Sequence, residues 1–80
     1  MGERERLAWR CRRGMLELDL MLRGFLERGY DQLDETGQAG FLRLLDYPDQ
    51  TLLEILMGRM QTADPVLRHV VEAIRAHAAH

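Results

Sequence analysis

The sequence contains no lysine, one cysteine, two prolines and few aromatic residues, and it has no long apolar run. A single cysteine, Cys11, cannot form an internal disulfide, so a disulfide framework is excluded and a reducing compartment is expected. No uncharged stretch is long enough to span a bilayer. The start, rich in glutamate and arginine from Glu3 to Arg6, does not have the pattern of a signal peptide. We therefore expect a cytoplasmic protein without membrane contact.

The composition is that of one small soluble domain covering residues 1–80, with 46% hydrophobic and 30% charged residues. A chain of this length buries only roughly 60 to 65% of its unfolded surface. Its free energy of unfolding should be on the order of 4 to 12 kcal/mol. Little stability is left for a deep catalytic cavity.

Charge is distributed unevenly, although the net charge is only -2. Residues 1–28 carry a net charge of +2, residues 29–58 carry -5 and residues 59–80 carry +1. The acidic middle and the pI of about 5.9 oppose binding to a phosphate backbone, so no nucleic-acid partner is expected. All 11 basic residues are arginine. This usage reflects either a nucleotide composition bias or the ability of arginine to pair bidentately with carboxylates.

Apolar residues recur at helical spacing throughout, and nothing alternates like a strand. The clearest segment is residues 65–78, where Asp64 supplies an N-cap and Pro65 fits the first turn. Further helices are predicted over residues 3–12, 15–28, from 34 or 36 to about 45, and 48–58. The third should begin irregularly, because Gly37 and Gly40 weaken its first turns. The fold class is therefore all-α, a compact five-helix bundle.

The fourth predicted helix carries more apolar residues than one buried face can hold. They are Leu52, Leu53, Ile55, Leu56 and Met57. Two interpretations remain open: the helix packs centrally, or it leaves a small apolar patch exposed.

The densest group of polar residues joins the first two helices, from Arg10 to Asp19. If the helix were continuous there, Arg13 and Glu17 would lie four residues apart on one face, close enough for an ion pair. Such a pair could be an ordinary surface salt bridge, contributing about 0 to 1 kcal/mol. Alternatively, Gly14 beside the pair could let a partner's backbone approach closely. Trp9, just before this group, is either a core anchor or an exposed interface residue.

Catalytic and metal-binding residues are not evident. No base accompanies Cys11, so a small buried apolar residue is the better interpretation of it than a nucleophile. His69 and His77 are two helical turns apart rather than one, so they and Glu72 do not predict a metal site. The three histidines, His80 included, are expected on the surface.

The stretch Trp9 to Asp19, WRCRRGMLELD, resembles the signature Arg-Gly-x-x-Glu of the succinate dehydrogenase flavinylation factors, the SdhE or YgfY family. Further matching segments follow in order: FLERGYDQL at 25–33, LLDYPD at 44–49, LMG at 56–58 and Ala63-Asp64. The resemblance covers about residues 9–74. One departure is that Leu53 and Ile55 stand where many members carry an aromatic pair.

The resemblance implies a bundle of the YgfY type and a bacterial, cytoplasmic protein that is not an enzyme. Members bind the flavoprotein subunit of succinate dehydrogenase, and in some bacteria fumarate reductase, and promote covalent attachment of FAD to it. FAD is then the cofactor of the client, and this chain, expected to be a monomer, holds none stably. The residues carried over to the partner interface are Arg13, Gly14 and Glu17 of the signature, with Arg12, Asp19 and Trp9 beside them.

Two other functions remain open. Some members of the family have been described as antitoxins of a toxin pair. The chain could also be a helical interaction module unconnected with flavin, which a large exposed apolar area on residues 52–57 would favour.

Overall fold

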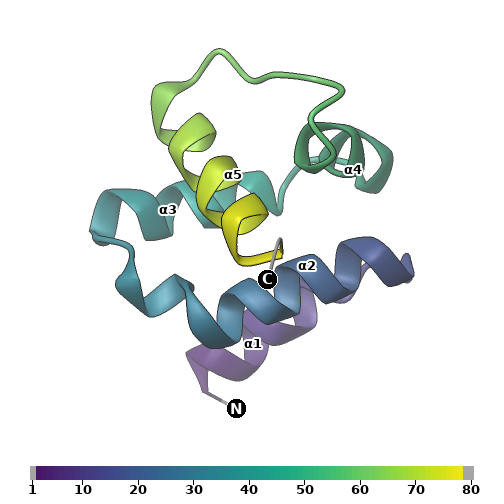
Figure 1. Ribbon diagram of the computed structural model, residues 1–80. Helices are drawn as coiled ribbons and strands as arrows, with labels where there is room; N and C mark the ends of the chain where they lie inside the picture. The colour runs from purple at the N-terminus through teal and green to yellow at the C-terminus, as the bar shows by residue number, and fades with distance from the viewer. Residues whose placement is uncertain (1, 79–80) are drawn as a thin grey trace.

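A computed structural model describes residues 2–78, which form five α-helices and one short 3₁₀ turn (Figure 1). The helices are α1 (Glu3–Arg10), α2 (Leu16–Arg28), α3 (Glu35–Leu44), α4 (Asp49–Leu56) and α5 (Pro65–Ala78), with η1 (Tyr30–Gln32) after α2. No strand occurs among the described residues. The all-α, five-helix prediction is confirmed, and none of these helices is long and apolar enough to cross a membrane.

The last helix lies at the centre of the molecule, packed against α2, α3 and α4 (Figure 1). Its bounds are those predicted. The Asp64 carboxylate accepts the N–H of Val66 at 2.8 Å, which is the predicted N-cap, and also pairs with Arg43 at 2.8 Å. The hydrogen bond from Arg43 is the main reason that the pKa of Asp64 is lowered, with the N–H groups of Val66 and Leu67 adding to it. One carboxylate thus begins α5 and ties it to α3.

The third helix begins regularly, so the prediction of an irregular start was wrong. The Asp34 carboxylate accepts the N–H of Gly37 at 2.8 Å and caps the helix. Gly40 lies against α5: a Cβ there would be 2.8 Å from Val66 Cγ1. The glycine therefore allows close helix packing, which offsets its low helix propensity.

The fourth helix lies at the side of the molecule and buries its main apolar face there (Figure 1). Leu52, Ile55 and Leu56 are buried, while Leu53 and Met57 are partly buried. Ile55 thus belongs to the core, and Leu53 packs against it. Leu53 and Met57 keep part of their apolar surface accessible, which agrees with the predicted small exposed patch.

The first helix ends at Arg10, two residues before its predicted end. The chain turns there, and the turn buries the Cys11 side chain completely. Cys11 is thus a small core residue, as predicted. Burial raises the pKa of its thiol to about 11, although the nearby cations of Arg13 and Arg10 act in the opposite direction. Such a thiol is neutral at physiological pH and is a poor nucleophile.

Candidate partner-binding site

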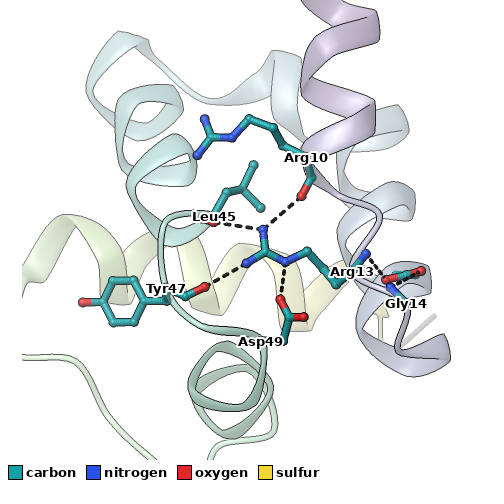
Figure 2. Close-up of polar contacts among 7 residues, drawn as sticks. Arg10, Arg13, Gly14, Leu45, Tyr47 and Asp49 are labelled. Atoms are coloured by element: carbon teal, nitrogen blue, oxygen red, sulfur yellow. Dashed lines mark hydrogen bonds and ion pairs between the residues drawn. The ribbon is translucent and has the colours of Figure 1, made fainter.

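Arg13 lies in the extended segment between α1 and α2, and its guanidinium reaches the loop between α3 and α4 (Figure 2). Its Nε donates to Asp49 Oδ1 at 2.7 Å. Its Nη2 donates to the carbonyl of Tyr47 at 2.8 Å. Its Nη1 donates to the carbonyls of Leu45 at 2.9 Å and Arg10 at 3.1 Å. The fork of one arginine therefore clamps two loops that are far apart in the sequence.

The Arg13 side chain is only 14% exposed, so its guanidinium is largely shielded from solvent, whereas its partner Asp49 is 44% exposed. The helical ion pair with Glu17 does not form among the described residues, because the chain leaves the helix at Arg10 and resumes it at Leu16. Arg13 thus points inward, and its charge is satisfied within the chain. Whether it also contacts a partner stays a prediction.

The carboxylate of Asp19 holds the same segment from the other side. Its Oδ1 accepts the N–H of Arg13 at 2.7 Å, and its Oδ2 accepts the N–H of Gly14 at 3.3 Å. Asp19 lies in the first turn of α2, so these bonds fasten the incoming chain to the helix. Together, Arg13 and Asp19 set the backbone conformation at Gly14.

Gly14 has a φ of +80°, a conformation that side chains rarely adopt, and it is exposed. No atom lies within 4 Å of the position that a Cβ would occupy. The glycine is thus needed for its backbone conformation and not to fit against any described part of the chain. The result is a bare stretch of backbone facing solvent.

The remaining predicted residues, Trp9, Arg12 and Glu17, are all exposed. Trp9 is 58% exposed, which decides that it is not a core anchor. The Arg12 guanidinium lies over its ring, 4.8 Å from the centroid, in a cation–π contact. Glu17 is exposed in the first turn of α2, where the helix dipole favours a carboxylate.

Two apolar residues beside the site were not among the predicted ones. Leu16 is 75% exposed and Leu20 is 61% exposed, one helical turn apart on α2. Their signal in the sequence was present: both fall outside the inward stripe of Leu18, Leu22 and Phe25. Large apolar side chains that stay exposed on one helix face are candidates for contact with another protein.

Other candidate chemistry finds no support in residues 2–78. They contain no group of three or more His, Cys, Asp or Glu side chains arranged to hold a metal ion. His69 is exposed, as predicted. His77 is not fully on the surface, because its ring packs edge-on against Phe25 with 5.4 Å between centroids. The prediction for His80 lies outside the described residues.

Comparison with known proteins adds to this geometry. The family model described as flavinator of succinate dehydrogenase matches residues 5–78. The chain belongs to this family. A relative named FAD assembly factor SdhE in Shewanella oneidensis is 39% identical over 92% of this chain and 90% of its own length. Proteins of the same name in Methylococcus capsulatus (40%; 95% of this chain, 92% of its own) and Pseudomonas putida (42%; 90% and 86%) are similar.

Members of this flavinator family are assembly factors and not enzymes. The resemblance seen in the sequence is therefore confirmed. It agrees with a site that consists of bare backbone, one carboxylate, a stacked Trp–Arg pair and exposed leucines. Such a surface is suited to recognition rather than to bond-making.

Proposed function

We propose that this protein binds the flavoprotein subunit of succinate dehydrogenase in the cytoplasm, as a monomer, and promotes covalent attachment of FAD to that subunit. The flavoprotein of a fumarate reductase is a second client of the same kind. The observation that carries the proposal is the exposed, left-handed Gly14 next to the exposed Glu17, within a chain that belongs to the flavinator family.

The site residues divide into two roles in this proposal. Gly14, Glu17, Arg12 and Trp9 contact the client: the glycine admits its backbone, and the two charged groups form oriented hydrogen bonds with it. Arg13 and Asp19 are positioning residues, since their hydrogen bonds hold the segment that presents Gly14.

The assistance is conformational. A protein that binds one arrangement of its partner better than another shifts the partner toward that arrangement. Here the favoured arrangement brings the flavin's reactive methyl carbon to the acceptor histidine of the client. The client then performs its own chemistry, and this chain needs neither a flavin pocket nor a catalytic residue.

The test is co-expression of the chain with a candidate succinate dehydrogenase flavoprotein, followed by flavin fluorescence in a denaturing gel. Wild type should raise covalent fluorescence, and Glu17→Ala should not. Glu27→Ala is the matched control, because Glu27 is an exposed glutamate near the other end of α2. Equal fluorescence with and without the wild-type chain, given folded client and sufficient FAD, would contradict the proposal.

A Gly14→Arg variant tests the interface separately from the fold. It should abolish flavinylation while circular dichroism still shows a folded helical protein, because the new side chain enters open space and a side chain at this positive φ costs only about 1 to 2 kcal/mol. An unfolded variant would remove the support for a purely interfacial role.

A further inference from the structure

An open groove of about 440 Å³ lies between α2 and the C-terminal ends of α4 and α5. Leu20 and Met21 of α2 and Leu56 and Met57 at the end of α4 provide its apolar lining. Leu20 is the exposed member, at 61%, and Leu56 is buried beneath it. An apolar side chain from another protein could therefore bury its surface here.

Charges of opposite sign line the same groove. Glu17 contributes a carboxylate from α2, and Arg75 contributes a guanidinium from α5. The two do not form an ion pair with each other or with any other group among residues 2–78. Each is thus available to a complementary charge on a bound protein.

The groove is continuous with the candidate partner-binding site, because Glu17 belongs to both. It also continues along α2 into a smaller hollow of about 270 Å³, which shares Leu20 and Met21 and reaches Gly24. A partner seated over Gly14 and Glu17 would therefore extend over Leu20 without a gap.

We propose that this groove receives an apolar side chain of the flavoprotein client, flanked on the client by a cation facing Glu17 and a carboxylate facing Arg75. This inference rests on the proposed function and adds Leu20, Met57 and Arg75 to the recognition surface. The apolar contact supplies affinity, and the two charges in opposite order fix the direction in which the client segment lies.

The experiment measures binding of purified variants to the flavoprotein subunit by calorimetry, alongside in-gel flavin fluorescence. Leu20→Asp and Arg75→Glu should each weaken binding by about tenfold or more, which is the scale of one lost anchor or charge pair. The matched controls are Met60→Asp and Arg68→Glu, an exposed apolar residue and an exposed arginine that do not line the groove. Both should bind within about twofold of wild type. Thermal melts establish that all four variants are folded.

The outcomes separate the two proposals. If Glu17→Ala loses binding while Leu20→Asp and Arg75→Glu bind like wild type, the groove is not used and the proposed function stands. If wild type itself does not bind the flavoprotein, the proposed function fails and this inference with it. If light scattering shows a dimer that Leu20→Asp converts to monomer, the occupant is a second copy, which overturns the groove as a client site.

Discussion

Two exposed glycines in this chain share a φ of +80° but differ in what lies beside them. Gly58 follows α4 and closes it: its N–H bonds to the Ile55 carbonyl at 3.1 Å, and that of Arg59 bonds to the Glu54 carbonyl at 2.9 Å. This is the Schellman pattern of a helix C-terminus. The Arg75 guanidinium lies 3.1 Å from where a Gly58 Cβ would be. The space beside Gly58 is thus filled by a side chain of the same protein.

Gly14 has the same φ, but no atom lies within 4 Å of the position that its Cβ would occupy. Gly14 does not end a helix with a Schellman hydrogen-bond pattern. Its backbone is held instead by the Asp19 carboxylate, which accepts the N–H groups of Arg13 and Gly14. A position that needs glycine for its φ, although no described part of the chain packs against it, is a candidate for function. The comparison indicates that Gly58 serves the fold and Gly14 serves recognition.

The largest effect should separate the two glycines directly. Asparagine tolerates this backbone region better than other side chains, so Gly14→Asn and Gly58→Asn should each cost about 1 kcal/mol or less in the free energy of unfolding. Gly14→Asn should nevertheless abolish flavinylation of the client in the denaturing gel, because a side chain now occupies the bare backbone. Gly58→Asn should retain it. Loss of flavinylation in both variants would contradict the conclusion that only Gly14 takes part in recognition.

Removal of the clamp beneath Gly14 should produce the largest loss of stability. Arg13→Ala leaves Asp49 and three carbonyls without their donor, so urea unfolding should show a loss of about 3 kcal/mol. The neighbouring exposed Arg12 is the control: Arg12→Ala loses only the contact with Trp9, about 0.5 to 1 kcal/mol. Equal losses in the free energy of unfolding would contradict the conclusion that Arg13 points inward and Arg12 points to solvent.

Alkaline pH should lower the free energy of unfolding through Cys11, which lies in the turn that precedes Gly14. Its pKa is raised from 9.0 to about 11 by burial. The unfolded thiol therefore ionises first, and stability present below pH 9 falls by about 2 kcal/mol as the pH rises toward 11. Urea titrations across this range check it, with Cys11→Ala as the control that should lose most of the slope. A small slope should remain above pH 10, since burial and then Glu3 raise the pKa of Tyr30.

Acid should lower the stability of the protein through Asp64 at the start of α5. This effect should be the smallest of those predicted. The pKa of Asp64 is lowered, chiefly by the hydrogen bond from Arg43, so its contribution is present above pH 3.8 and is lost as the pH falls through the folded pKa. At pH 7, Asp64→Asn should melt a few degrees below wild type. The gap should close in acid. A constant gap in thermal melts across this range would exclude a role for the charge.

The fold class, the number of α-helices and most helix bounds could be predicted from the sequence. These depend on short-range rules: apolar spacing within a helix, a proline in the first turn, an aspartate before it and a glycine after the last turn. The residue types at 13, 14 and 17, in that spacing, also indicated the family. A short signature of this kind lies within a few residues of chain, so it does not depend on how the helices pack.

The direction in which each site residue points could not be predicted from the sequence, because it depends on how the helices pack. Arg13 bonds to Asp49, 36 residues away, and no local pattern encodes that meeting. The same applies to the exposure of Trp9 and to the groove that joins Glu17 with Arg75 across α2 and α5. The spacing of apolar residues along a helix shows which residues share a face. Which face is exposed to solvent depends on how helices that are distant in the sequence pack together.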